Sequence, residues 1–301
     1  MQKTKLLGTF AASGLIILIG SASGCAVLGS ASPVAPFERM LLFHPVRYPR
    51  GDWEADGLPI EDTWFQADDG TQLHGWFLGH PDPSGVALFI HGNGGNITSH
   101  KRTLRMLNQG QRLAVLAFDY RGYGRSEGKP SEQGILQDAR AARRQLAART
   151  GVAEDEIVLV GFSLGGGVAV DLAALDGARA LVLMSTFTSL PDVAANHLPW
   201  TSPHVNMTQG LNSLAKIKRY RGPLLISHGT LDRVIPYEHA VELFEAAYGP
   251  KKLVPLEGGG HTDPDSDEYQ AALREFIRAL PPIPDTRRWE AGPHPIKGGV
   301  I

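Results

Sequence analysis

The chain has a single cysteine and no excess of either charge. Since Cys25 is the one thiol in 301 residues, no disulfide can form within the chain. The 29 basic and 31 acidic residues give a formal net charge of −2, and the basic residues form no stripe along the sequence. A nucleic-acid partner is therefore not expected. The sequence also lacks internal repeats, which excludes solenoid and propeller architectures.

The composition is that of a protein with a buried core. Hydrophobic residues make up 43% and charged residues 20% of the chain, as in ordinary globular domains. The length exceeds the needs of a small domain and fits one large α/β domain.

The N-terminus has the layout of an export signal. Lys3 and Lys5 form a positively charged start, residues 6–20 are apolar, and residues 21–24 are small. The apolar stretch is too short and too weakly flanked to indicate a transmembrane helix. We therefore predict a signal peptide over residues 1–24.

Cys25 stands directly after these small residues. Its position resembles that in a bacterial lipoprotein signal, in which the peptide is removed before a cysteine that then carries a lipid. Ala22 departs from this pattern, since leucine is more usual there. The prediction is an exported lipoprotein of the bacterial cell envelope, held at a membrane surface by a lipid on Cys25. The alternatives are a soluble secreted or periplasmic protein and a protein with an uncleaved anchor.

Hydrophobic periodicity predicts two antiparallel strands followed by alternating strands and helices. Residues 62–67 and 72–78 alternate between apolar and polar on either side of an Asp-Asp-Gly turn, which is the signature of a hairpin. Further strands are expected at 86–90, 113–118, 157–160, 180–184, 224–227 and 252–256, and helices at 131–149, 164–175, 236–248 and 265–280. This order implies an α/β fold: a doubly wound, mostly parallel sheet with helices on both faces. Ligands of such sheets bind beyond the carboxyl ends of the strands.

The same pattern divides the chain into segments. Residues 25–60 are expected to be a tether and N-terminal extension, residues 61–280 the folded domain, and residues 281–301 a tail rich in Pro and Gly. Within the domain, residues 187–220 interrupt the alternation with apolar side chains among prolines and asparagines. We predict that this insertion is a small cap over the site. The alternative is a segment that packs flat on the domain without touching substrate.

One short motif indicates nucleophilic chemistry. Residues 161–165 fit Gly-x-Ser-x-Gly, with Ser163 at the apex of a sharp turn from strand to helix. Glycines are needed there because side chains two residues from the serine would collide in so tight a turn. Residues 124–128 match the same pattern, but they lie several residues beyond a strand and lead into a Gly-Lys-Pro loop. We therefore predict that Ser163 is the nucleophile and that Ser126 is a turn residue.

A serine nucleophile needs a base within hydrogen-bond reach and a group that orients the base. In this fold the chain order is serine, acid, histidine. Asp232 follows the penultimate predicted strand, and His261 follows the last strand after three glycines. We predict His261 as the base and Asp232 as the acid, with Asp192 as the alternative acid. A further cluster, Asp263, Asp265 and Asp267, is interpreted as solvated charges at a helix N-terminus.

A glycine-rich loop is expected to complete the site. Residues 91–96 read His-Gly-Asn-Gly-Gly-Asn and follow a buried strand, so their backbone N–H groups can point at a developing oxyanion. The predicted oxyanion donors are the N–H groups of Asn93 and Leu164. A metal or phosphate site is the alternative. No cluster of ligating side chains supports a metal, and the loop lacks the lysine and hydroxyl residue of a P-loop, so neither cofactor nor metal is predicted.

Taken together, these motifs resemble those of the α/β-hydrolases. The resemblance covers residues 62–280 and rests on five motifs in the same order: residues 91–96, 119–128, 161–166, 229–232 and 260–261. The subgroup it resembles contains small serine esterases, acyl-protein thioesterases and related peptidase-like enzymes. It implies that residues 119–128 are a structural loop beside the site and that Ser126 is not catalytic. The signal region, the cap and the tail depart from the pattern.

The predicted function is a cofactor-independent serine hydrolase that cleaves a carboxylic ester or thioester through an acyl-enzyme on Ser163. The substrate is expected to be a small-molecule or lipid-like acyl ester. A serine peptidase of the same fold is the alternative, although the insertion contains no cluster of carboxylates of the kind expected to bind a substrate amine. A non-catalytic binding protein on the same fold is a further alternative. Such proteins usually lose a member of the catalytic triad, whereas all three residues are present here.

Overall fold

The computed structural model describes residues 42–197, 200, 202–262 and 266–281. The predicted signal peptide, Cys25 and residues 282–301 lie outside this part of the chain, so lipid attachment at Cys25 stays a prediction. Within the described part, no helix has the length and hydrophobicity needed to cross a bilayer.

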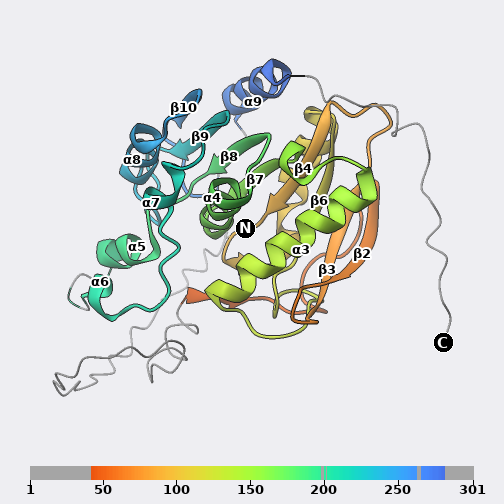
Figure 1. The fold of residues 1–301 in the computed structure, drawn as a ribbon, viewed down its shortest axis with the longest axis horizontal. Coiled ribbons are helices and arrows are strands. Elements are labelled where there is room, and N and C mark those ends of the chain that lie inside the picture. The colour runs from red at the N-terminus through yellow and green to blue at the C-terminus, as the bar shows by residue number, and fades with distance from the viewer. Residues whose placement is uncertain (1–41, 198–199, 201, 263–265, 282–301) are drawn as a thin grey trace, which may run out of the picture. The chain divides into compact units, whose positions relative to one another are not determined.

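The core of the described chain is an eight-stranded sheet with the order β10-β9-β8-β7-β4-β6-β3-β2 (Figure 1). Its strands are β2 Ile60–Gln66, β3 Gln72–Leu78, β4 Gly85–Ile90, β6 Leu113–Phe118, β7 Val158–Phe162, β8 Ala180–Met184, β9 Leu224–Gly229 and β10 Lys251–Leu256. The pairs β2–β3 and β3–β6 are antiparallel, and every other neighbouring pair is parallel. The predicted mostly parallel sheet with an antiparallel start is thereby confirmed.

Helices cover both faces of this sheet, as predicted. They are α2 Lys101–Arg105, α3 Glu132–Thr150, α4 Leu164–Asp176, α5 Leu190–His197, α6 Pro203–Asn206, α7 Ser213–Ile217, α8 Glu238–Ala246 and α9 Asp267–Ala279. Figure 1 shows α3 and α4 in front of the strands. With α7 and α8 they contribute to one hydrophobic cluster, whereas α2 and α9 contribute to a second cluster on the other face.

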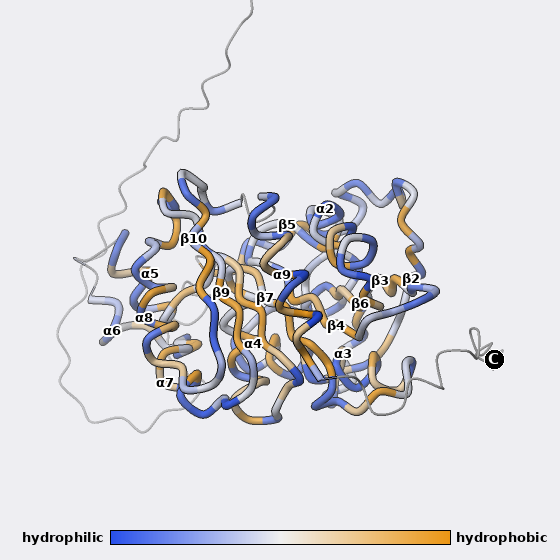
Figure 2. Tube along the Cα trace, turned by 90° about the horizontal axis from the view of Figure 1, so that it is seen from above, coloured by the Kyte–Doolittle hydropathy of each residue, from blue (hydrophilic) through white to orange (hydrophobic). Residues whose placement is uncertain are grey.

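The central strand β4 shows why continuous apolar runs form the middle of the sheet. All of its residues are buried. Val86, Leu88 and Ile90 belong to the first cluster, whereas Ala87 and Phe89 belong to the second. Successive side chains on a strand point to opposite faces, so a strand between two helical layers must be apolar at every position. The central strands are accordingly mostly orange in Figure 2, which is the colour of hydrophobic residues.

The ends of α3 illustrate how local signals set helix boundaries. Ser131 precedes the helix in an extended conformation, and its hydroxyl accepts a hydrogen bond from the N–H of Gly134 at 3.1 Å. Gly151 follows the helix with φ 70°, a left-handed conformation that glycine adopts without a steric penalty. The helix predicted over residues 131–149 is therefore present, with Ser131 as its N-cap.

Two stretches contain structure that sequence periodicity did not reveal. Between β4 and β6 the chain forms the 3₁₀ turn η1 Ile97–His100, then α2, then the π-helical turn η2 Met106–Gly110. In the predicted N-terminal extension, β1 His44–Pro45 pairs in parallel with β5 Gly94–Gly95. Each of these pieces is too short for a repeat of apolar positions to be visible.

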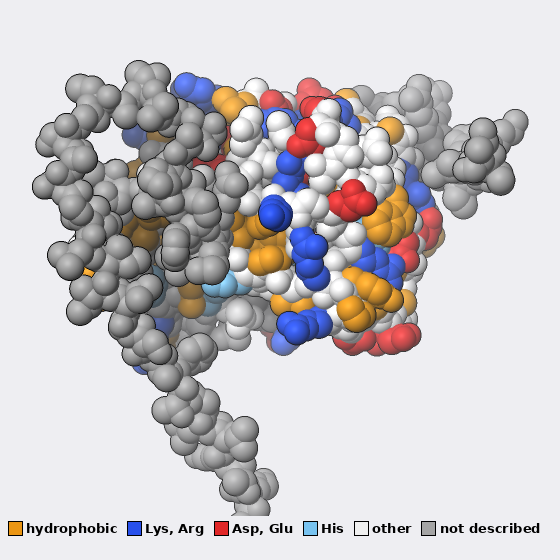
Figure 3. Space-filling view, turned by 90° about the horizontal axis from the view of Figure 1, so that it is seen from below, with side chains coloured by type: hydrophobic (Ala, Val, Ile, Leu, Met, Phe, Trp, Pro, Cys, Tyr) orange, Lys and Arg blue, Asp and Glu red, His pale blue; other side chains and the backbone are white. Residues whose placement is uncertain are grey.

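The surface shown in Figure 3 carries interspersed acidic and basic side chains. On that face of the described chain the charges of the two signs are mixed, in keeping with the balanced net charge of the sequence.

Candidate active site

Ser163 occupies the turn between β7 and α4. Its backbone has φ 52° and ψ −116°, a left-handed conformation that strains a residue with a side chain. A Cβ atom on Gly161 would overlap the carbonyl oxygen of Gly165, and one on Gly165 would overlap the carbonyl oxygen of Ile90. The glycines of the motif are thus required by close backbone approach. The serine side chain is 8% exposed, at the surface end of a buried turn.

Three residues from separate parts of the chain meet at this turn. His261 follows β10, and its Nε2 lies 3.1 Å from the Oγ of Ser163. Its Nδ1 lies 2.7 Å from the Oδ2 of Asp232, which follows β9. The structure therefore brings the predicted nucleophile, base and acid into one hydrogen-bonded chain.

Asp232 is held as an anion. Its Oδ1 accepts hydrogen bonds from the N–H groups of Val234 at 2.8 Å and Ile235 at 2.9 Å. Burial opposes ionisation, but hydrogen bonds from His228, His261 and Ile235 outweigh it and hold the pKa of Asp232 well below its usual range. A carboxylate facing Nδ1 favours the tautomer of His261 with a proton on Nδ1. In that tautomer Nε2 is left as an acceptor for the hydroxyl of Ser163.

The alternative acid lies elsewhere. Asp192 is on α5, where its carboxylate accepts hydrogen bonds from the hydroxyls of Thr188 at 2.7 Å and Ser189 at 2.5 Å. Of the two candidates, the structure places Asp232 and not Asp192 against His261. Asp263 and Asp265 fall outside the described residues.

Ser126, in the second Gly-x-Ser-x-Gly match, is fixed within the backbone framework. Its hydroxyl donates to the carbonyl oxygen of Asp119 at 2.6 Å and accepts from the N–H of His74 at 2.9 Å. The side chain is buried. These contacts join the 119–128 loop to β3, so the structure gives Ser126 the place of a turn residue.

The glycine-rich loop borders Ser163. A Cβ on Gly92 would lie 3.0 Å from the ring of Phe162 and 3.4 Å from the Cβ of Ser163, so the loop can approach this closely because residue 92 is glycine. Asn93 is the next residue, and Leu164 directly follows Ser163 at the start of α4. The first N–H groups of a helix have no partner within the helix. Leu164 is thus the neighbour of Ser163 along the chain, and Asn93 is the neighbour of the glycine that approaches it, whereas the role of their N–H groups as oxyanion donors stays a prediction.

Buried aromatic residues hold the glycine-rich loop in place through hydrogen bonds and ring contacts. The hydroxyl of Tyr120 donates to the carbonyl oxygen of His91 at 2.8 Å, and the Nδ1 of His91 is 2.7 Å from the carbonyl oxygen of Gly92. The rings of His91 and His100 are stacked, with centroids 5.8 Å apart. Burial lowers the pKa of His91 to about 3 and that of His100 to about 4. The sequence indicated the loop but not these contacts. The loop follows β4 and Tyr120 follows β6, so the two come together only in the folded chain.

These two histidines predict a loss of stability in mild acid. In the unfolded chain both take up protons as the pH falls below 6.5, whereas the folded chain excludes them until about pH 4 for His100 and about pH 3 for His91. The free energy of unfolding therefore decreases as the pH falls from 6.5, by about 2 kcal/mol per histidine at pH 5. Thermal unfolding followed by circular dichroism between pH 7.5 and pH 5 measures this decrease.

His100→Phe is the matched variant for this experiment. It keeps an aromatic ring next to Phe89 and Phe162, which the ring of His100 contacts, but it cannot be protonated. The midpoint temperature of this variant should fall less steeply with pH than that of the unaltered protein. Identical slopes would show that proton uptake by His100 does not destabilise the fold.

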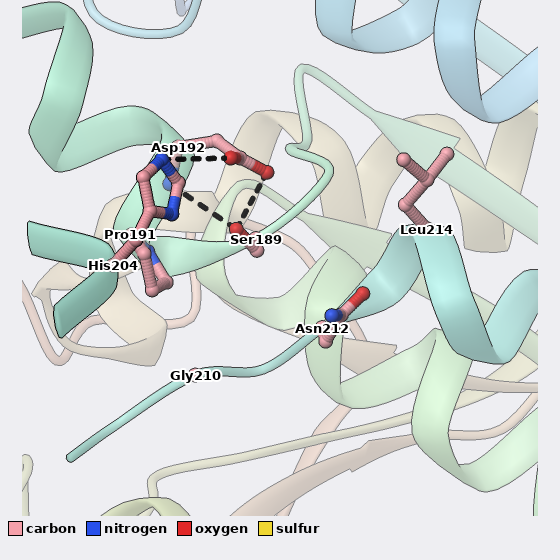
Figure 4. A pocket seen from close by; sticks show the side chains of 7 residues that line it. All are labelled: Ser189, Pro191, Asp192, His204, Gly210, Asn212 and Leu214. Atoms are coloured by element: carbon pink, nitrogen blue, oxygen red, sulfur yellow. Dashed lines mark hydrogen bonds and ion pairs between the residues drawn. The ribbon is translucent and has the colours of Figure 1, made fainter. Parts of the chain in front are cut away.

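The insertion at residues 187–220 contains a pocket of about 400 Å³ (Figure 4). It is lined by Ser189, Pro191, Asp192, His204, Gly210, Asn212 and Leu214. Figure 4 shows Ser189, His204 and Asp192 facing one another on one side of it, with Asn212 and Leu214 on the other. Neither Ser163 nor His261 lines this pocket, so the prediction that the insertion caps the site stays a prediction.

Apolar residues of the insertion pack largely into the domain. Phe187, Leu190 and Leu211 belong to the hydrophobic cluster on the α4 side of the sheet. Trp200, by contrast, is 76% exposed. These apolar side chains of the segment therefore stabilise the fold, and Phe187 and Leu211 lie against Gly167 of α4.

Comparisons with known proteins agree with this architecture. The sequence pattern of the alpha/beta hydrolase family matches residues 87–206. The uncharacterized protein MT2364 of Mycobacterium tuberculosis is 39% identical over 246 residues, covering 80% of this chain and 87% of that protein. The alpha/beta hydrolase domain-containing protein WAV2 of Arabidopsis thaliana is 34% identical over 301 residues, covering 89% of this chain and 96% of that protein.

A solved structure has the same fold. The Pyrococcus furiosus esterase Pf2001 superposes with a TM-score of 0.67 at 21% identity, covering 79% of this chain and 98% of that one. At this identity the likeness concerns the fold alone. Together with the sheet order and the identity to WAV2, these findings show that the chain belongs to the alpha/beta hydrolase family.

Proposed function

We propose that the protein is a serine hydrolase that cleaves a carboxylic ester or thioester through an acyl-enzyme on Ser163. The observation that carries the proposal is the hydrogen-bonded chain from Ser163 through His261 to Asp232. A serine hydroxyl is a weak nucleophile by itself, and an imidazole oriented by a carboxylate is the arrangement that activates it.

The first half of the reaction forms the acyl-enzyme. As the Oγ of Ser163 attacks the carbonyl carbon, the Nε2 of His261 takes the hydroxyl proton. The carbonyl oxygen becomes an oxyanion, to which the N–H groups of Asn93 and Leu164 donate. When the tetrahedral intermediate collapses, the bond to the alcohol or thiol breaks, and His261 transfers its proton to that leaving group.

The second half releases the acid. A water molecule enters, gives a proton to the Nε2 of His261 and attacks the acyl carbon, forming a second oxyanion on the same two donors. Collapse of this intermediate breaks the bond to the Oγ of Ser163, which regains its proton from His261. The carboxylate of Asp232 stabilises the imidazolium in both halves and holds the ring in position.

Two observations favour an ester or thioester over a peptide. The Pf2001 structure, which has the same fold, is that of an esterase. In addition, residues 187–220 contain one carboxylate, Asp192, and that carboxylate already accepts two hydroxyl hydrogen bonds. The predicted cap thus offers no cluster of carboxylates for the amine of a peptide substrate.

A substrate panel tests the proposal. We expect purified protein to hydrolyse p-nitrophenyl esters of graded chain length and a matched acyl thioester, with kcat/KM for these substrates well above that for aminoacyl anilides. The chain length with the highest kcat/KM would define the acyl group.

Faster cleavage of the anilides than of the esters would favour a peptidase. Failure to turn over any substrate, combined with failure to react with a fluorophosphonate, would favour a non-catalytic binding protein. Either result would contradict the proposed function.

A further inference from the structure

The N-terminal extension lies against the glycine-rich loop. We call residues 44–50 the N-terminal strap. Its first two residues form β1, which pairs with β5 inside the loop, and the N–H of Val46 donates to the carbonyl oxygen of Gly95 at 3.0 Å. The amide of Asn96 donates in turn to the carbonyl oxygens of Val46 and Arg50, both at 3.0 Å. Both ends of the strap are therefore hydrogen-bonded to the glycine-rich loop.

The strap is also bonded to the 119–128 loop. The N–H of Tyr48 donates to the carbonyl oxygen of Gly124 at 2.8 Å, and the N–H of Gly124 donates to the carbonyl oxygen of Val46 at 3.0 Å. The guanidinium of Arg47 donates to the carbonyl oxygens of Gly122 at 3.1 Å and Gly128 at 2.7 Å. The strap thus connects two loops that follow different strands.

These two neighbours of the glycine-rich loop converge on Asn93. Its Oδ1 accepts a hydrogen bond from the backbone N–H of His44 in the strap at 3.2 Å. It accepts a second from the hydroxyl of Tyr123 in the 119–128 loop at 3.1 Å. An amide oxygen has two lone pairs, so both of its positions are used. The side chain of Asn93 is consequently held by donors outside its own loop.

Tyr123 is suited to this contact. Its ring is fully buried and lies against the rings of His91 and Tyr120, with centroids 5.4 Å and 5.6 Å away. Burial raises the pKa of Tyr123 well above its usual range, so the hydroxyl keeps its proton and remains a donor. A rigid ring and a permanent donor define the position of Asn93 Oδ1 closely.

We propose that the hydroxyl of Tyr123 and the backbone N–H of His44 position Asn93, so that its backbone N–H is held ready for the oxyanion formed during acyl transfer. Tyr123 is then a positioning residue that acts through Asn93, and the strap is part of the catalytic framework. The inference rests on the proposed function, because it assigns these contacts to the stabilisation of an oxyanion. Loss of one oxyanion donor typically lowers kcat by a factor of about 100 to 1000, and a donor that is misplaced loses part of that contribution.

Tyr123→Phe tests the proposal, because it removes the hydroxyl and keeps the buried ring. We expect kcat for a p-nitrophenyl ester to fall by about 10-fold or more with little change in KM, since the oxyanion exists in the transition state and not in the bound substrate. The matched control is Tyr220→Phe. Tyr220 is also buried, and its hydroxyl bonds to the carbonyl oxygens of Ala178 and Pro223, away from the glycine-rich loop. This control should lose comparable stability and retain kcat.

A double-mutant cycle separates positioning from a general structural effect. Asn93→Ala removes the acceptor, so adding Tyr123→Phe to it should lower kcat no further. Equal kcat values for Tyr123→Phe and Tyr220→Phe would overturn the proposal. So would a Tyr123→Phe effect that persists in the Asn93→Ala background. If Asn93→Ala does not fold, the comparison of the two tyrosine variants still decides the question.

Labelling of the unaltered protein distinguishes this inference from the proposed function. If the protein reacts with a fluorophosphonate and hydrolyses esters, while the Tyr123→Phe variant matches its control, the positioning role alone is wrong. If the unaltered protein neither reacts nor hydrolyses, the proposed function itself is wrong, and the positioning role is wrong with it.

Discussion

Replacing Ser163 by alanine is expected to lower kcat for ester hydrolysis by roughly four to six orders of magnitude. The reason is that the Nε2 of His261 lies 3.1 Å from the Oγ of Ser163, and alanine has no hydroxyl to take the place of that nucleophile. Alanine tolerates the left-handed backbone of residue 163 no better and no worse than serine, so the variant should fold with similar stability. Activity on p-nitrophenyl esters, with circular dichroism as a check on folding, measures the effect.

The second Gly-x-Ser-x-Gly match provides the control. Ser126→Ala should retain labelling by a fluorophosphonate probe, whereas Ser163→Ala should lose it. Because the hydroxyl of Ser126 bonds to Asp119 and His74, this control is expected to be less stable, but its nucleophile is untouched. Probe labelling that persists in Ser163→Ala would remove Ser163 from its proposed role.

Asp232→Asn is expected to lower kcat by about three to four orders of magnitude. An amide at this position can present its NH₂ group to the Nδ1 of His261, which favours the tautomer with a proton on Nε2. That tautomer cannot accept the proton of Ser163. The substitution also removes the anion that stabilises the imidazolium during the reaction. Steady-state kinetics on one ester substrate measures the loss.

Asp192→Asn is the matched substitution, because Asp192 is the other carboxylate considered for the acid. Its carboxylate bonds to Thr188 and Ser189 next to α5, so the variant should keep kcat within about threefold of the unaltered protein. An outcome in which Asp192→Asn abolished turnover and Asp232→Asn preserved it would reverse the assignment of the acid.

The fold could be predicted where a single physical pattern dominates. The strands β6 and β8 begin and end at the residues predicted for them, because a strand between two helical layers must be apolar throughout and the run ends where the layer ends. Helix α3 lies within one residue of the predicted range 131–149 at each end, because Ser131 caps its start and Gly151 follows its end. Chain order predicted that Ser163, Asp232 and His261 lie at the carboxyl ends of parallel strands, and the structure brings them together.

Other parts could not be predicted because their determinants are distant contacts. The pairing of His44 with Gly94 joins residues from separate regions over two positions, which leaves no periodicity to detect. The anchoring of Asn93 by Tyr123 depends on two loops meeting in space. For residues 187–220, composition alone did not reveal which apolar side chains face the core. Phe187 and Leu211 are buried there because α4 lies beneath them.

The positions of the site residues along the chain also determine when during synthesis the site becomes complete. Ser163 and His261 are 98 residues apart along the chain, and β9 and β10 occupy one end of the sheet. The ribosome therefore delivers the serine turn well before the two strands that position Asp232 and His261. A nascent chain, or one in which β9 and β10 have detached, would hold a serine without its base. Under the proposed function, hydrolysis by this protein thus requires that β9 and β10 have docked. Formation of the rest of the sheet would not by itself give activity.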